Sequence, residues 1–226
     1  MKNNNKLKFA ALVFSILMFS SSIQAKINVV ASIKPIHSLV ASVMDGVGEP
    51  SLIVDGSASP HTFQLKPSHA KLLQNADIIF WIDKDLENFL VKPLSSIAKK
   101  SKKISLMEIN SIKKLKFREK NIFVEKHDDH KGHKEHDDHK GHKEHAHGEF
   151  DIHIWLDPEN AKTMSMEIAK ELSKIDPKNK LIYESNAKKV SFKINKMMKE
   201  IKKEINKDAA FVVFHDAYQY LSLIHI

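Results

Sequence analysis

The chain has 226 residues, no cysteine and a formal net charge of +8 at pH 7. This length allows one or two domains with a substantial core, and the lack of cysteine excludes disulfides, thiolate zinc sites and cysteine nucleophiles. The positive charge is spread over lysine-rich helical patterns without clustered aromatic residues, so the sequence gives little support for a nucleic-acid partner.

Residues 1–25 have the three parts of a secretory signal. Three lysines precede an apolar run of 11 residues, Phe9–Phe19, which is too short to span a bilayer. Small residues then lead to an expected cut after Ala25, which would lower the net charge to +5. An uncleaved membrane anchor is the alternative. Because no cysteine can carry a lipid at the cut, we expect the mature protein to be free in a bacterial periplasm.

Short β-branched runs alternate with helical patterns over the first half of the mature chain. Strands are predicted at 27–33, 51–54, 77–82 and 103–109, and helices at 35–44, from 67, and at 86–99. The run 77–82 is almost continuously apolar, which is typical of a strand buried on both faces of a parallel sheet. The pattern predicts an α/β lobe with a parallel sheet and flanking helices, whose ligand loops lie at the carboxyl ends of the strands.

The second half predicts a strand followed by two helices. Residues 150–156 alternate like a half-buried strand, with Asp151, His153 and Trp155 on one face. Asp157-Pro158 then begins a helix through about Lys174, and Asp176-Pro177 begins one with an apolar stripe over roughly 30 residues, some 40 Å long. We predict an N-terminal lobe at 26–175, a linking helix at 176–207 and, beginning with a strand at 211–214, the start of a second α/β lobe at 208–226.

Residues 125–149 form a histidine-rich loop. The unit H-D-D-H-K-G-H-K-E occurs twice in succession, and eight of the chain's 14 histidines lie here: His127, His130, His133, His136, His139, His142, His145 and His147. Such a run has too few apolar residues to build a core, and histidine-rich tracts are typical of metal binding. A solubilising spacer is the alternative, against which the repeat argues.

Three histidines outside that loop stand where loops meet predicted strands: His61, His153 and His215. Taken singly, each is more often a structural histidine, and about 90 and about 60 residues separate them. A parallel sheet would nevertheless bring its strand ends together. Three neutral imidazoles and a fourth oxygen ligand suit tetrahedral Zn²⁺ better than manganese or calcium. His37, on a predicted helix, is interpreted as structural.

Five motifs carry a family resemblance: Lys34–Val40, Gly56–His61, Leu65–Ser68, Asp151–Pro158 and Phe214–Tyr218, with a His/Asp-rich insertion before the fourth. Together they resemble the substrate-binding proteins of bacterial zinc ABC transporters. The resemblance implies two α/β lobes joined by a long rigid helix, with zinc held in the cleft by His61, His153 and His215. It also implies a monomeric periplasmic receptor that captures zinc, passes it to a membrane permease and catalyses nothing, with a loop that gathers or senses zinc.

Several alternatives stay open. Manganese receptors of the wider family place a carboxylate where this chain has His215, so that residue favours zinc over a manganese or iron receptor. A periplasmic metal buffer acting through the histidine loop alone is another class, and a zinc hydrolase with an open water position is a third. Against the hydrolase, the chain has no H-E-x-x-H motif, and Asp216 is its one obvious carboxylate beside the expected ligands.

Since family members continue beyond the segment around Tyr220, we expect a truncated second lobe and a missing fourth ligand.

Overall fold

The computed structural model describes residues 27–117, 149–206 and 217–222. Its centre is a four-stranded, fully parallel sheet in the order β2-β1-β3-β4. The strands are β1 (Val29–Ala31), β2 (Ser51–Leu52), β3 (Ile78–Trp81) and β4 (Lys102–Ser105). The central strand β3 buries Ile78, Ile79 and Phe80 completely, as its continuous apolar run predicts. The predicted parallel α/β lobe is therefore confirmed.

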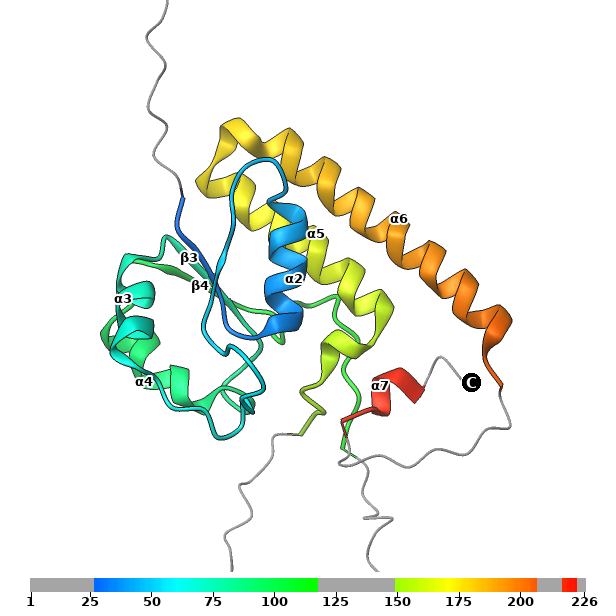
Figure 1. Cartoon of the computed structure of the whole chain (residues 1–226), viewed down its shortest axis with the longest axis horizontal. Helices are drawn as coiled ribbons and strands as arrows, with labels where there is room; N and C mark the ends of the chain where they lie inside the picture. Colours follow the sequence, from blue (N-terminus) through cyan, green and yellow to red (C-terminus); the bar gives the residue numbers. More distant parts are fainter. Residues whose placement is uncertain (1–26, 118–148, 207–216, 223–226) are drawn as a thin grey trace, which may run out of the picture.

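Helices cover the sheet on both sides (Figure 1), with α3 and α4 on one side and α2, α5 and α6 on the other. Their bounds are α2 (Lys34–Val43), α3 (Pro67–Asn75), α4 (Asn88–Ser96), α5 (Pro158–Ile175), α6 (Lys180–Glu204) and the short α7 (Gln219–Ser222). Helix α5 begins as predicted, because Asp157 Oδ1 accepts the backbone N–H of Glu159 at 2.8 Å and Pro158 occupies the first turn. No described helix is both long and apolar enough to cross a membrane.

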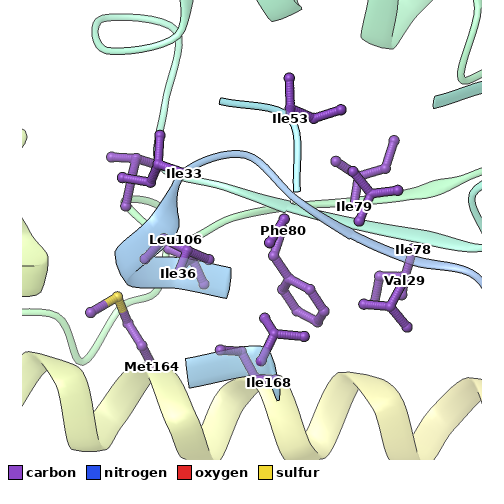
Figure 2. Packing of buried hydrophobic residues seen from close by; sticks show 14 of the residues in the cluster. Val29, Ile33, Ile36, Ile53, Ile78, Ile79, Phe80, Leu106, Met164 and Ile168 are labelled. Carbon is purple, nitrogen blue, oxygen red and sulfur yellow. The ribbon is translucent and has the colours of Figure 1, made fainter. Parts of the chain in front are cut away.

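The core is packed on both faces of β3. In Figure 2, Phe80 points towards Ile168 of α5, whereas Ile79 lies on the opposite side of the strand near Ile53. This alternation follows from the two-residue repeat of a strand. Each fully buried Ile or Phe side chain contributes about 1.5–3 kcal/mol relative to an exposed one. The packed sheet gives the loops at its carboxyl edge a fixed base.

A buried carboxylate joins two strand ends at that edge. Glu87, fully buried, accepts a hydrogen bond from the hydroxyl of Ser32, directly after β1. It also accepts the backbone N–H groups of Ile82 and Asp83, directly after β3, each at 3.0 Å. Burial raises the pKa of Glu87 to about 7, although these hydrogen bonds favour the ionised form. The arrangement ties β1 and β3 to the start of α4.

The long helix α6 has two unlike halves. Its 25 residues correspond to a length of about 37 Å. The first half buries Tyr183, Ala187 and Val190, and the Asn186 amide donates to the carbonyl of Val43 at 3.1 Å. From residue 191 to residue 206, no residue is buried. A long helix after Asp176-Pro177 is thus confirmed, whereas the division into 26–175, 176–207 and 208–226 stays a prediction.

The strand predicted at 150–156 is wrong. Phe150 makes an isolated antiparallel bridge with Lys116, and the chain then forms a 3₁₀ helix at Ile154–Leu156. The cause is local, because the Asp151 carboxylate accepts the backbone N–H of His153 at 2.9 Å and so satisfies a donor that a strand would pair with its neighbour. Burial does not alternate here either, since residues 151 to 154 are all buried.

Several predictions fall outside the described residues. They concern the secretory signal at 1–25, the histidines of the loop from His127 to His147, the strand at 211–214 and the proposed ligand His215.

Candidate metal centre

His153 is held by a buried carboxylate. The residue lies directly before the 3₁₀ helix and is 7% exposed, and its Nδ1 is 2.7 Å from Oδ1 of Asp151, which is 1% exposed. An ionised carboxylate can only accept, so Nδ1 carries the proton of this hydrogen bond. In a neutral imidazole the lone pair is then on Nε2, which is the ring nitrogen able to coordinate a metal. The ring of Trp155 meets the His153 ring edge-on at a centroid distance of 5.3 Å.

His61 comes to the same place from a different part of the chain. It lies on the exposed loop between β2 and α3, where its backbone N–H donates to Ser59 Oγ at 3.3 Å. The loop turns at Gly56, whose φ of +68° is a conformation that favours glycine. The centroids of the His61 and His153 rings are 6.0 Å apart, with their planes at 52°. The fold thus makes neighbours of two imidazoles separated by about 90 residues.

The spacing of the two rings is close to that of two ligands on one metal ion. With Zn–N distances of about 2.0–2.1 Å and near-tetrahedral angles, two imidazoles on one zinc place their ring centroids about 5–5.5 Å apart. The observed 6.0 Å is slightly longer. The two side chains can therefore supply two nitrogen ligands.

An aromatic cluster attaches the His61 loop to the helices beside it. The Phe63 ring packs against Phe89 of α4 at 5.1 Å and against His69 of α3 at 5.4 Å between centroids. His69 Nδ1 also accepts the backbone N–H of Lys66 at 3.1 Å, at the start of α3. Two residues beyond His61, the loop is thus anchored on both α3 and α4.

The segment after residue 216 packs against the same site. The hydroxyl of Tyr220 donates to the backbone carbonyl of Asp151 at 2.8 Å and accepts the backbone N–H of Leu115 at 3.0 Å. Tyr220 and Ala217 are both buried. Burial, supported by the charges of Asp151 and Asp157, raises the pKa of Tyr220 to about 12, so the hydroxyl remains a donor at neutral pH.

Among the described residues, His37 does not join the pair. The Nε2–H of His37 donates to the carbonyl of Pro50 at 3.0 Å, which confirms the structural interpretation of that residue. Within the described ranges, no group of three or more histidine, aspartate or glutamate side chains converges on one point. His215 and the eight loop histidines lie outside these ranges. The structure thus brings His61 and His153 together, and their role as ligands stays a prediction.

Sequence reasoning missed the residues that support the pair. It placed Asp151 beside His153 but gave it no role, although an aspartate two residues before a candidate ligand is a usable signal for an orienting carboxylate. It gave no role to Phe63, Glu87 or Tyr220 either. Their contacts join segments far apart in the chain, and nothing in the local pattern marks them.

A parallel sheet with two neighbouring imidazoles, one of them hydrogen-bonded to a buried carboxylate, is an arrangement expected of an α/β metal-binding protein. Residues 29–223 match the family model described as "Zinc-uptake complex component A periplasmic". The chain belongs to this family of zinc-uptake proteins.

Named relatives agree with this assignment. The chain is 41% identical over 97% of its length to the "High-affinity zinc uptake system protein ZnuA" of Brucella abortus, and it spans 71% of that protein. It is 30% identical over 96% of its length to the ZnuA of Yersinia pestis, spanning 69% of it.

Solved structures share the fold. The Zn(II)-bound AdcA of Streptococcus pneumoniae superposes with a TM-score of 0.65 at 23% identity, over 89% of this chain and 38% of that one. The Mn-bound periplasmic metal-binding protein of Candidatus Liberibacter asiaticus gives 0.67 at 22% identity, over 88% and 66%. At these identities the likeness concerns the fold alone.

Proposed function

We propose that the protein is a periplasmic receptor that captures Zn²⁺ and delivers it to the permease of a zinc ABC transporter. The observation that carries the proposal is the approach of His61 and His153 to 6.0 Å at the loop edge of the sheet. Imidazole is a preferred ligand of zinc. The names of the ZnuA relatives support uptake as the purpose of binding.

His215 is the proposed third ligand. Support comes from the described residues that follow it, because Ala217 and Tyr220 are buried and the Tyr220 hydroxyl donates to Asp151, two residues before His153. A residue two positions before Ala217 is within about 7 Å of it along the chain. The chain that follows His215 thus returns to the segment that carries His153, and this supports His215 as the third ligand.

The histidine loop at 125–149 is proposed as a secondary, weaker zinc-collecting element. Its support is the repeated spacing of its eight histidines. The protein has no catalytic step in this proposal: it binds a cation reversibly and acts as a monomer beside its permease. It takes no nucleic-acid partner, and a signal peptide at 1–25 directs it to the periplasm.

Zinc titration of variants tests the proposal. In the mature protein, His61→Ala, His153→Ala and His215→Ala should each weaken zinc binding far more than deletion of residues 126–147. Binding should also weaken below about pH 6, because coordination requires neutral imidazole. Isothermal titration calorimetry with a competing chelator measures both effects.

The same titration separates the alternatives. A metal buffer acting through the loop alone would lose all binding on loop deletion and none in the triple histidine variant. A manganese receptor would bind Mn²⁺ in preference to Zn²⁺ when both are offered. Equal zinc affinity of the triple variant and the parent protein would refute the proposed function.

A further inference from the structure

The geometry points to Asp151 as a positioning residue that fixes the tautomer of His153 and presents Nε2 of that ring to the metal. This inference rests on the proposed zinc-binding function and adds to it a residue that does not itself touch the ion. Its basis is a set of contacts that Asp151 makes with His153, Leu115 and Tyr220.

Hydrogen bonds to both backbone groups of Asp151 hold this residue in place. Its N–H donates to the carbonyl of Leu115 at 2.8 Å, and its carbonyl accepts the hydroxyl of Tyr220 at 2.8 Å. The Tyr220 hydroxyl in turn accepts the N–H of Leu115 at 3.0 Å, so three segments of the chain meet at Asp151. With both backbone groups bonded, the position from which the carboxylate projects is fixed.

One carboxylate oxygen of Asp151 makes two contacts with His153. Oδ1 of Asp151 accepts both the backbone N–H at 2.9 Å and the ring Nδ1–H at 2.7 Å. The backbone contact sets the turn, and the ring contact sets the rotation of the imidazole. In a neutral ring held in this way the lone pair is on Nε2, because Nδ1 carries the proton given to Asp151.

The charge of the carboxylate also bears on metal binding. Among the described residues, Oδ2 of Asp151 is buried without a hydrogen-bond partner. A buried carboxylate with incomplete hydrogen bonding is costly. A cation bound at Nε2 makes the imidazole more positive, which the carboxylate beside it favours, so the charge that is costly without metal strengthens metal binding.

The same features distinguish positioning from a purely structural role. If Asp151 only stabilised the fold, Asp151→Asn would lower stability and zinc affinity together. A positioning carboxylate predicts a different result, because asparagine keeps the shape and one acceptor oxygen but removes the charge. Zinc affinity should then fall 10- to 100-fold, while the unfolding midpoint without metal stays close to that of the parent protein.

The experiment uses the mature protein, zinc with a competing chelator, and ¹⁵N NMR of the histidine rings. In the metal-free parent protein, His153 should give the Nδ1–H pattern. Asp151→Ala should turn this into a mixture of tautomers. Asp157→Asn is the matched control, since Asp157 is also a buried carboxylate but contacts the N–H of Glu159. It should leave both the His153 tautomer and zinc affinity unchanged.

The outcomes are distinguishable from failure of the proposed function. Equal zinc affinity of His153→Ala and the parent protein would refute zinc binding at this site, and positioning with it. Loss of affinity in His153→Ala but none in Asp151→Asn would refute the positioning role alone. An Nε2–H tautomer for His153 in the metal-free parent protein would also refute it, and that measurement requires no variant to fold.

Discussion

The two histidines of the candidate centre lie 6.0 Å apart but are supported in opposite ways. His153 is buried, hydrogen-bonded to Asp151 and packed against Trp155. His61 is exposed on a turn-rich loop, and the nearest packing anchor of that loop is Phe63, two residues further on. One candidate ligand therefore belongs to the packed lobe, and the other belongs to its surface.

This difference separates the contribution of a ligand to zinc binding from its contribution to the stability of the metal-free fold. A buried, hydrogen-bonded ligand contributes to the stability of the metal-free fold as well as to binding, because its removal leaves a buried partner unsatisfied. An exposed loop ligand contributes to binding alone, because solvent replaces its contacts. The two histidines should therefore have equal importance for zinc and unequal importance for the fold.

The largest expected effect comes from replacing each histidine by alanine. Each replacement should weaken zinc binding by about 4 kcal/mol, roughly a thousandfold, since structural zinc binding of about 10–16 kcal/mol is shared among three or four ligands. His153→Ala should in addition lower the free energy of unfolding without metal by about 1–3 kcal/mol, because the Asp151 carboxylate loses its ring donor. His61→Ala should leave that free energy within about 0.5 kcal/mol.

Chelator-competition titration and urea unfolding of the metal-free protein measure the two quantities separately. His37→Ala is a useful reference, because His37 donates to Pro50 and lies outside the pair. It should lower stability without affecting zinc affinity. Equal destabilisation by His61→Ala and His153→Ala would contradict the contrast between loop and lobe.

A smaller effect concerns the sheet base that both histidines share. Burial raises the pKa of Glu87 from 4.5 to about 7, so the folded state holds a proton that the unfolded state releases between these values. The contribution of this group to stability is therefore largest below about pH 4.5 and is lost as the pH rises to about 7. This shift of the Glu87 pKa corresponds to at most about 3 kcal/mol of the free energy of unfolding.

Glu87→Gln removes this pH dependence, because glutamine stays neutral while it can still accept the N–H of Ile82. The variant should therefore gain stability relative to the parent protein as the pH rises from about 5 to about 8. Urea unfolding at several pH values, reported as the difference between the two proteins, isolates the group. A constant difference over that range would show that Glu87 does not titrate as its burial requires.

The sequence predicts those parts of the lobe that depend on contacts between residues close together in the chain. The strands and helices from Ile27 to Ser105 follow from apolar periodicity and from turn residues, which act locally. The start of α5 follows from Asp157-Pro158 for the same reason. The prediction of a strand at 150–156 is wrong because the side chain of Asp151 accepts the backbone N–H of His153. The alternation of apolar and polar residues gives no information about such a hydrogen bond.

The candidate site was partly predictable. His61 and His153 stand out because histidine is a common metal ligand and both lie near predicted strand ends. Their neighbours Phe63, Glu87 and Tyr220 do not stand out, since aromatic and acidic residues at such positions are common in any fold. Only the folded arrangement shows that Phe63 meets Phe89 and that Tyr220 meets Asp151.

The smallest predicted effect tests the anchor of the His61 loop. Phe63→Ala removes an aromatic pair with Phe89 and a ring contact with His69, and such a pair contributes about 0.5–1.5 kcal/mol beyond its buried area. Zinc affinity should fall about tenfold, since part of the binding free energy must then order the loop that carries His61. Phe63→Leu should restore part of that affinity.

The control for this effect is Phe192→Ala on α6, where the ring is 71% exposed. Loss of that ring should change neither stability nor affinity by more than about 0.5 kcal/mol. Stopped-flow release of zinc to a chelator adds a kinetic measurement, and release should be faster in Phe63→Ala than in Phe192→Ala. Equal rates in the two variants would show that the order of the His61 loop does not depend on Phe63, and its support would then have to come from the turn around Gly56 and Ser59.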